Sequence, residues 1–328
     1  MPLPVVRIVT PYGAAANNGN WRTAARWARL LRGRYRAMVQ VDALQGEVPP
    51  GDVAADCLIA LHARRSYPAI RAWRDRLPQR ALIVVLTGTD LYRDLPDDPQ
   101  ARASLQLADR LVLLQEDALR YLPAQIRRKA RVVYQSAPAL APADRPASRL
   151  NCILVGHLRA EKDPATALRA WSLLPPDLPL HLLHVGAALD PGLAAECEAL
   201  MARDRRYRWV GARPHAWTRQ AIKRAHLLIV PSLMEGGANV IVEAVTAGTA
   251  VLASRVSGNV GMLGRDYAGY FPVGEPQALA RLVLRCREDP ALHRRLAREC
   301  RARRARFTPA RERAALLRVL SEVLPRRQ

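Results

Sequence analysis

Short apolar, β-branched runs alternate with amphipathic stretches along nearly the whole 328-residue chain. This alternation is typical of parallel strands that are joined by helices. In the first half, we expect strands at Val5–Thr10, Met38–Val41, Cys57–Leu61, Leu82–Leu86, Leu111–Leu114 and Val132–Tyr134, and helices near Asn20–Leu31, Tyr67–Leu77, Pro99–Ala108 and Asp117–Lys129. The pattern predicts an α/β domain with a doubly wound parallel sheet.

The segment Gln135–Arg149 interrupts this alternation with three prolines and many small residues, as a linker does. A second series follows, with strands expected at Cys152–Val155, His181–Val185, Tyr207–Val210, Leu227–Val230 and Ala250–Ala253, and helices near Ala165–Leu174 and Asn239–Ala247. After a turn at Phe271–Pro276 the pattern is helical to the end. We therefore expect two Rossmann-like domains, 1–135 and 150–305, facing a cleft, a linker at 136–149, and a C-terminal helix, 306–328, that returns to the first domain.

The chain is strongly basic, with 51 Lys+Arg against 29 Asp+Glu and a net charge of +22. Nearly all of this basic charge is arginine, spread over many helices rather than along one stripe. No zinc finger, RNP box or KH loop accompanies it, so nucleic-acid binding is not expected as the main function. Small polyanionic ligands would still be attracted.

Cysteine spacing and hydropathy indicate the cellular compartment in which the protein is expected. Five cysteines are scattered and none forms a CxxC pair, which argues against disulfides and a structural zinc site. The longest apolar runs are far shorter than the roughly 20 residues that cross a bilayer. The opening MPLPVVRIVTPYG carries Arg7 within a β-branched run, which predicts a strand and not a signal peptide. We expect a cytoplasmic protein without a transmembrane segment.

The first strand leads into the glycine-containing loop TPYGAAANNGNWR. Gly13 and Gly19 flank small residues, and Asn18 or Asn20 can cap the helix that starts near Trp21. Free backbone N–H groups at such a helix start would suit an anion. The spacing is neither the dinucleotide fingerprint nor a Walker loop, and a capped, flexible turn is the alternative interpretation.

A second glycine loop carries two carboxylates within PSLMEGGANVIVEAVTAG. Glu235 and two glycines precede a helix that starts near Asn239, and Glu243 lies one turn inside it. Gly236 and Gly237 let a backbone approach a ligand closely, and the helix start favours a phosphate or a sugar hydroxyl. A single glutamate on a helix is usually a solvated surface residue. The complete string is therefore stronger evidence for a functional site than either carboxylate alone.

That complete string resembles a known family. Glu235-GGANVIV-Glu243 is similar to the EX7E motif of retaining, nucleotide-sugar-dependent glycosyltransferases with the GT-B fold. VGHLRAEKDP at Val155–Pro164 and VGEPQAL at Val273–Leu279 match two further motifs of that family in the same order. The resemblance covers most of the chain and implies two facing Rossmann-like domains.

A narrower resemblance joins motifs from both halves of the chain. IVTPYGAAANNGNWRTAARWARLL, ALHARRS, LTGTDLYRDL, VGHLRAEKDP, MEGGANVIVEA and SRVSGNVGMLG together resemble the selenosugar synthases of selenoneine biosynthesis. This implies transfer of a sugar from a UDP-sugar, UDP-N-acetylglucosamine by that likeness, to selenophosphate with formation of a carbon–selenium bond. It implies small-molecule substrates and no cofactor, and it leaves the oligomeric state open.

The resemblance assigns donor-binding roles residue by residue. It implies that Glu243 holds the ribose hydroxyls, that Glu235 holds the sugar hydroxyls, and that Lys162 neutralises the leaving diphosphate. The family's arginine before this lysine is replaced by His157, and Arg159 is the alternative phosphate ligand. The further donor-site residues are Gly13, Asn18, Gly19, Asn20, Gly236, Gly237, Ala238 and Asn239.

The acceptor site is expected in the first domain, at two strand ends. ALHARRS supplies His62, Arg64, Arg65 and Ser66, and TGTD supplies Thr89 and Asp90. A guanidinium pair beside a helix start suits a dianionic acceptor. The selenium of selenophosphate is already anionic, so no strong general base is required, and His62 completes the catalytic set with Glu235 and Lys162.

Two other functions remain open. An ordinary glycosyltransferase with a saccharide or lipid acceptor would share the C-terminal motifs, and the basic helix Trp21–Arg34, with Trp27, would suit a membrane-associated member. A nucleic-acid-binding protein is the remote alternative. No DxD motif or His/Asp/Glu cluster accompanies the expected phosphate site, so we expect metal-independent activity.

Overall fold

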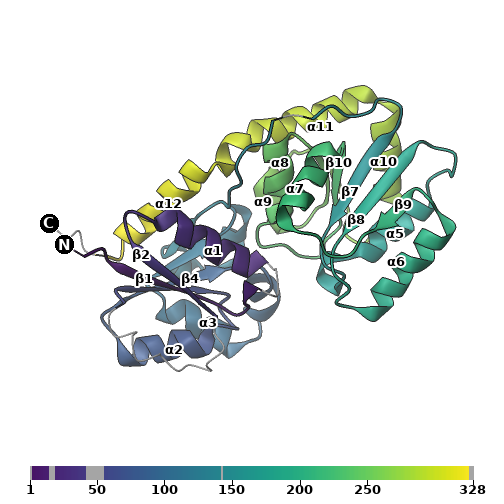
Figure 1. Ribbon diagram of the computed structural model, residues 1–328. Coiled ribbons are helices and arrows are strands. Elements are labelled where there is room, and N and C mark those ends of the chain that lie inside the picture. Colours follow the sequence, from purple (N-terminus) through teal and green to yellow (C-terminus); the bar gives the residue numbers. More distant parts are fainter. Residues whose placement is uncertain (1, 15–18, 42–54, 142, 325–328) are drawn as a thin grey trace. The chain divides into compact units, whose positions relative to one another are not determined.

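The computed structural model describes residues 2–14, 19–41, 55–141 and 143–324, and the chain divides into two compact units (Figure 1). Unit 1 combines Met1–Gln135 with Pro309–Gln328, and unit 2 is Ser136–Thr308. The segment 136–149 falls in unit 2 by this division, and the last helix, α12 (Pro309–Ser321), belongs to unit 1.

Unit 1 contains a six-stranded parallel sheet in the order β2-β1-β3-β4-β5-β6. Strands β3 and β4 are buried along their whole length, which is why they consist of apolar residues without alternation. The strand bounds are β1 (Val5–Thr10), β2 (Arg36–Val41), β3 (Cys57–Leu61), β4 (Ala81–Leu86), β5 (Arg110–Leu113) and β6 (Ala130–Val132).

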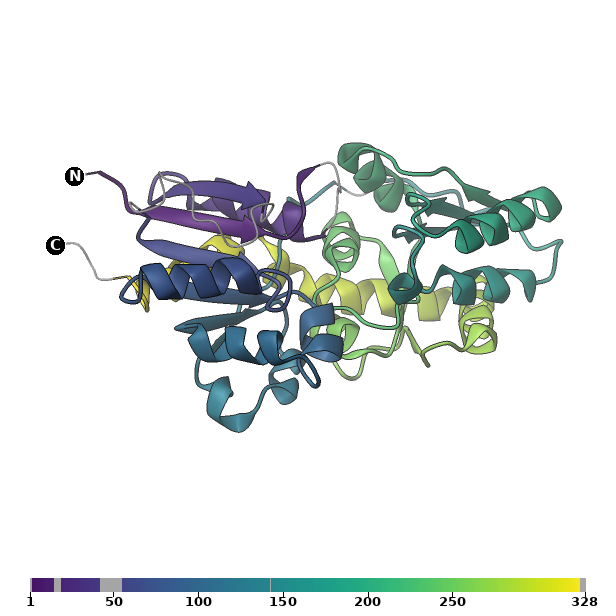
Figure 2. The same ribbon diagram turned by 90° about the horizontal axis from the view of Figure 1, so that it is seen from below.

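Helices cover both faces of this sheet. Figure 1 shows α1 and α12 over one face, with α2 and α3 over the other, and the turned view in Figure 2 has the second pair in front. The C-terminal helix is fixed to α1 by Glu312, whose buried carboxylate accepts hydrogen bonds from Arg26 Nε at 2.9 Å and Trp27 Nε1 at 2.8 Å. The helix bounds are α1 (Gly19–Leu31), α2 (Tyr67–Arg76), α3 (Pro99–Leu107) and α4 (Ala124–Arg127).

Unit 2 repeats the topology, with a six-stranded parallel sheet in the order β12-β11-β10-β7-β8-β9. Its strands are β7 (Leu150–Val155), β8 (Leu180–Val185), β9 (Tyr207–Trp209), β10 (Leu227–Val230), β11 (Ala250–Ser254) and β12 (Tyr270–Phe271). In both units the strand order reverses beside the strand that comes first in the chain, which is β1 in unit 1 and β7 in unit 2. The reversal lies between β1 and β3 in unit 1 and between β7 and β10 in unit 2.

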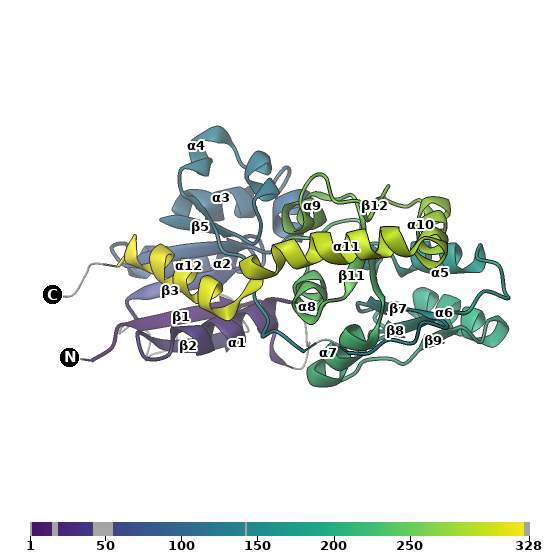
Figure 3. The same ribbon diagram turned by 90° about the horizontal axis from the view of Figure 1, so that it is seen from above.

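The helices of unit 2 pack in two groups. Helix α5 packs against α6 and α10, whereas α8 packs against α7 and α11. Figure 3 shows α11 running between α8 and α9. Helices α5 and α6 begin with a proline behind an aspartate that caps the helix, because Asp163 and Asp190 each accept a backbone N–H from the first turn. The bounds are α5 (Pro164–Ser172), α6 (Pro191–Arg203), α7 (His215–Arg224), α8 (Asn239–Ala247), α9 (Ser257–Leu263), α10 (Pro276–Glu288) and α11 (Pro290–Arg303).

The fold class predicted from the sequence is confirmed, and two element predictions are wrong. The helix expected over Asp117–Lys129 is a 3₁₀ turn, Asp117–Tyr121, followed by the short helix α4. Pro123 separates them, because the residue before a proline is driven to extended backbone and Leu122 has ψ 140°. Phe271, expected in a turn, pairs with β11 in the two-residue strand β12, a length that leaves no periodic pattern.

Candidate active site

The strand order of unit 2 determines where a ligand site is expected. In an open parallel sheet, the loops that follow the two strands at the reversal point diverge and leave a crevice at their carboxyl ends. In unit 2 these strands are β7 and β10. The loop after β7 carries Lys162, and the loop after β10 carries Glu235. Lys162 and Glu235 therefore each follow one of the two strands between which the strand order reverses.

The structure brings these two side chains into contact. Lys162 Nζ lies 2.5 Å from Glu235 Oε1, and the hydroxyl of Ser232 donates to the same oxygen at 2.7 Å. The Glu235 carboxylate is buried, whereas about a quarter of the Lys162 side chain is exposed. The backbone joins the loops as well, since the N–H of Leu233 donates to the carbonyl of Glu161 at 3.0 Å. This pair places one positive and one negative group in the expected crevice.

A glycine holds a neighbouring loop against this pair. A Cβ added to Gly258 would lie 1.8 Å from the carbonyl oxygen of Glu235, so only glycine fits where α9 begins. Asn259 beside it is fully buried, and its side-chain amide donates to the carbonyl of Ser254 at 2.9 Å. The segment Gly258-Asn259 therefore supports the backbone beneath Glu235.

The second carboxylate of the motif lies on the adjacent helix. Glu243 is 5% exposed on α8, and its Oε1 lies 2.6 Å from Nε2 of His215, the first residue of α7. Helix α8 starts at Asn239 with Ala238 at its N-cap, which supplies no side-chain acceptor for the first N–H groups of the helix. No N-cap side chain covers the start of α8, and a helix start of this kind suits a phosphate or a hydroxyl oxygen.

The two candidates for a phosphate ligand after β7 differ in their surroundings. His157 uses Nδ1 to accept the N–H of Ala187 at 3.0 Å, so its ring ties the loop after β7 to the loop after β8. Arg159 is exposed, with extended backbone, and no side-chain partner for it is found within the described residues. Arg159 is the more available of the two for a diphosphate.

In unit 1, the loop after β1 is only partly described. Gly13 and Ala14 follow the strand, Gly19 and Asn20 open α1, and Asn18 lies outside the described residues. The carbonyl of Gly19 accepts a hydrogen bond from the Thr23 hydroxyl at 2.9 Å. The candidate residues that are described in this loop thus lie at the carboxyl end of β1, at the reversal point of unit 1.

At the end of β3, on the other side of that reversal point, His62 is buried with a strained backbone. It is 2% exposed and has φ +76°, a conformation that costs a non-glycine residue on the order of 1–3 kcal/mol. Its Nδ1 accepts the N–H of Arg65 at 3.2 Å, which leaves Nε2 to carry the proton toward the Thr89 hydroxyl at 3.0 Å. Strain of this kind persists where surrounding contacts fix it, and it is frequent at functional sites.

Asp94 lies beside the His62 ring and was missed by the sequence analysis. Its Oδ2 is 3.9 Å from His62 Nε2 and, within the described residues, has no hydrogen-bond partner, although the side chain is 95% buried. It ends a π-helical turn, Asp90–Asp94, a geometry that occurs frequently at functional sites. Asp94 reaches the ring from this π-helical turn, and no sequence motif marks such a turn.

The other predicted acceptor residues divide into two groups. Asp90 and Ser66 are fully buried, and their polar atoms bind the main chain: Asp90 accepts the N–H groups of Thr87, Gly88, Leu91 and Ala63, and the Ser66 hydroxyl donates to Leu61. Arg64 and Arg65 are exposed. Arg64 Nε donates to Asp98 at 2.7 Å, and the Arg65 guanidinium lies 5.0 Å from the centre of the Tyr12 ring. Arg65 therefore joins the loops after β3 and β1.

Comparison with known proteins gives a family likeness for unit 2. Residues 144–303 match the family model of "Glycosyl transferases group 1". This segment is therefore similar to group 1 glycosyltransferases. It contains both loops of the β7–β10 crevice and both glutamates of the motif.

Solved structures extend the likeness in fold to the whole chain. Anabaena HepE in complex with UDP and glucose has a TM-score of 0.76 at 17% identity, with 97% of this chain and 100% of that chain covered. A sucrose-phosphate synthase from Thermosynechococcus elongatus has a TM-score of 0.77 at 16% identity, with 98% and 99% covered. The pneumococcal O-GlcNAc transferase GtfA, with UDP and GlcNAc bound, has a TM-score of 0.65 at 14% identity, with 81% and 56% covered. At these identities the likeness shows the GT-B fold.

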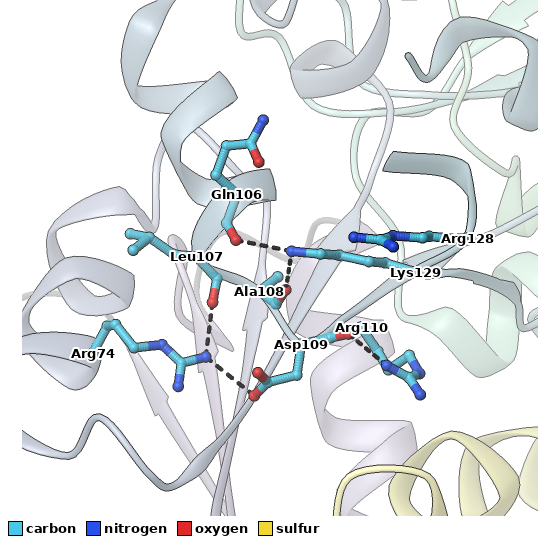
Figure 4. Close-up of a pocket in the computed structure, with 8 residues that line it drawn as sticks. All are labelled: Arg74, Gln106, Leu107, Ala108, Asp109, Arg110, Arg128 and Lys129. Carbon is cyan, nitrogen blue, oxygen red and sulfur yellow. Dashed lines mark hydrogen bonds and ion pairs between the residues drawn. The ribbon is translucent and has the colours of Figure 1, made fainter. Parts of the chain in front are cut away.

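A hollow of about 470 Å³ lies in unit 1 at the amino end of β5 (Figure 4). It is lined by Arg74, Gln106, Leu107, Ala108, Asp109, Arg110, Arg128 and Lys129. Lys129 Nζ donates to the carbonyls of Gln106 and Ala108 at 2.9 and 2.8 Å, and Arg74 donates to that of Leu107 at 2.7 Å. Burial lowers the pKa of Lys129. Because these cations cap the C-terminus of α3, their role is structural.

In the described part of the chain, no three His, Cys, Asp or Glu side chains converge as metal ligands. No helix in the same residues is long and apolar enough to span a membrane.

Proposed function

We propose that the chain transfers a sugar from a UDP-sugar, UDP-N-acetylglucosamine in the first instance, to selenophosphate. The observation that carries the donor half is the Lys162–Glu235 pair in the β7–β10 crevice of a segment similar to group 1 glycosyltransferases. HepE binds UDP and glucose, and GtfA binds UDP and GlcNAc, which supports a uridine nucleotide as the donor's leaving group.

In this mechanism each unit 2 side chain acts on one part of the donor. Glu243 accepts hydrogen bonds from the ribose hydroxyls, and Glu235 accepts them from the sugar. When the donor enters, the Lys162 ammonium turns from Glu235 toward the diphosphate. Negative charge grows on the β-phosphate as the glycosidic bond breaks, so a nearby cation stabilises the transition state more than the ground state.

The transfer step conserves atoms and electrons. A selenium lone pair of selenophosphate forms a bond to the anomeric carbon, and the bond from that carbon to the β-phosphate oxygen breaks. UDP leaves with the electron pair, so no oxidant or reductant is needed. Arg64 and Arg65, both exposed at the start of α2, supply charge-assisted donors for the dianionic acceptor.

A hydroxyl acceptor is the second candidate, and Asp94 favours it. A buried carboxylate oxygen that lacks a donor is satisfied by an O–H group, whereas a phosphate dianion supplies none. His62 Nε2 lies 3.9 Å from this oxygen and 3.0 Å from the Thr89 hydroxyl. A saccharide acceptor that reaches Asp94 would replace selenophosphate in the scheme.

The test is a two-acceptor assay with UDP-N-acetylglucosamine as the donor. UDP release is followed with selenophosphate, with a panel of simple sugars, and with neither, and the products are identified by mass spectrometry. We expect UDP release that depends on selenophosphate and a product that contains one selenium per sugar. Faster turnover with a sugar, and no selenium in the product, would support the hydroxyl-acceptor reaction instead.

A further inference from the structure

The contact between His215 and Glu243 joins two neighbouring helices of unit 2. His215 is the first residue of α7, Glu243 lies on α8, and the two helices pack against each other. The distance from His215 Nε2 to Glu243 Oε1 is 2.6 Å. None of the sequence motifs includes His215, because the residue lies 28 positions before Glu243 and belongs to another helix.

The two side chains differ in their access to solvent. The Glu243 side chain is 7% exposed, whereas that of His215 is 48% exposed. A carboxylate this deeply buried requires a donor, because an unpaired buried charge is costly. With Nε2–H donating to Glu243, the neutral ring keeps Nδ1 as an acceptor, and no partner for Nδ1 is found within the described residues.

A second charged side chain, Arg219, also lies near this carboxylate and is tied to the backbone by a hydrogen bond. Arg219 lies one turn further along α7, and Glu243 acts on it electrostatically. Its guanidinium Nη2 donates to the carbonyl of Pro138 at 2.6 Å. The hydrogen bond between His215 Nε2 and Oε1 therefore helps to set the direction of the Glu243 carboxylate.

We infer that His215 is a positioning residue for the nucleotide. It holds Glu243 in the orientation that receives two vicinal hydroxyls, and it thereby determines affinity for a ribonucleoside diphosphate. This inference rests on the proposed function, which gives Glu243 the ribose. The predicted ligand class is a nucleotide with a free 2′- and 3′-hydroxyl pair, and the effect falls on binding and not on the bond-breaking step.

Isothermal titration of UDP and 2′-deoxy-UDP tests the inference. The proteins are the wild type, His215→Ala, Glu243→Ala, the double variant, and His181→Ala, a matched control that removes an exposed histidine from β8. We expect His215→Ala to weaken UDP binding about tenfold and to reduce the preference for UDP over 2′-deoxy-UDP, with kcat for donor turnover within about twofold. We expect His181→Ala to bind as the wild type does.

The double variant separates positioning from a general loss of structure. If His215 acts through Glu243, the double variant binds UDP no more weakly than Glu243→Ala. His215→Gln, which keeps an N–H near the Nε2 position, should recover most of the affinity. Additive losses in the double variant, or UDP binding by His215→Ala within twofold of wild type, would overturn the inference. A wild-type protein that binds no uridine nucleotide would instead overturn the proposed function and this inference with it.

Discussion

Buried carboxylates lie at the strand ends of both units, but they are held in different ways. In unit 1, Asp90 accepts hydrogen bonds from four backbone N–H groups at 2.8–3.2 Å. In unit 2, Glu235 is held by the side chains of Lys162 and Ser232, and Glu243 by that of His215. A backbone N–H donor cannot rotate away from the carboxylate that it binds, whereas a flexible, partly exposed side chain can.

This difference separates a carboxylate that shapes a loop from one that can meet a ligand. The four N–H groups that donate to Asp90 fix the turn between β4 and α3. The Asp90 carboxylate therefore has no oxygen lone pair readily available for a ligand. Lys162 and His215 are themselves partly exposed, so a ligand can replace or share them, whereas Ser232, the second partner of Glu235, is buried. Substitution of Asp90 should therefore lower stability, whereas substitution of Glu235 or Glu243 should lower activity.

The largest expected effect is on catalysis in unit 2. Lys162→Ala should lower kcat about 100–1000-fold, because it removes the cation that meets the leaving diphosphate, and Glu235→Ala should lower it about 10–1000-fold. Steady-state turnover of UDP-N-acetylglucosamine measures both, and Lys223→Ala, on the opposite end of α7 from His215, is the control. Wild-type turnover in Lys162→Ala would remove this residue from the mechanism.

The second expected effect is on the stability of unit 1. Asp90→Ala leaves several buried N–H groups without an acceptor and should lower the free energy of unfolding by about 3 kcal/mol or more. Urea denaturation measures the loss. Asp98→Ala, which removes a helix cap at the start of α3, should cost only about 1 kcal/mol. If Asp90→Ala lost activity but kept its unfolding free energy, the assignment of Asp90 to the loop would be wrong.

A third prediction concerns the acid stability of unit 2. His184 is 1% exposed, and burial lowers its pKa to about 4, below the ordinary 6.5. The unfolded chain therefore takes up this proton first, and the stabilising contribution is complete above pH 6.5 and is lost as the pH falls toward 4. Between pH 7 and 5 the loss from His184 is about 2 kcal/mol. Urea titrations should show that His184→Gln loses less stability over this interval than wild type, and an equal loss would contradict the prediction.

The fourth prediction compares the two arginines of the acceptor loop. Arg65→Lys should raise the KM for selenophosphate about tenfold, or 1.4 kcal/mol, because an ammonium cannot form the two parallel bonds of a guanidinium. Arg64 already donates to Asp98, so Arg64→Lys should have the smaller effect. The KM for the UDP-sugar should stay unchanged in both variants. An unchanged selenophosphate KM in both would remove the pair from the acceptor site.

The smallest expected effect is that of chelation. In the proposed mechanism, Lys162 and the N–H groups at the start of α8 supply positive charge for the diphosphate, so activity should be unchanged after treatment with EDTA. Turnover before and after dialysis against EDTA measures this. A strict requirement for Mg²⁺ would contradict the role given to Lys162.

The sequence predicts those features that depend on residues close together in the chain. The apolar runs predict the strands, and Glu235 and Glu243 are found together because a single loop and helix carry both. The linear order of the strands also predicts two separate sheets. These features follow from local periodicity and from one continuous motif.

The features that the sequence does not predict depend on contacts between distant elements. His215 and Asp94 reach the candidate sites through helix packing and through a π-helical turn. Asp90 looks like a ligand in TGTD, yet the fold surrounds its carboxylate with backbone N–H groups. The role of a carboxylate therefore depends on which hydrogen-bond donors the tertiary structure places next to it.

Hydrogen–deuterium exchange in the presence of UDP tests the central claim most directly, because it locates the nucleotide on the chain. We predict that UDP slows exchange in peptides that cover 156–164 and 231–243, around Lys162, Glu235 and Glu243, and that peptides covering 106–110, in the hollow of Figure 4, do not change. Protection at 106–110 without protection in the two unit 2 peptides would contradict the account.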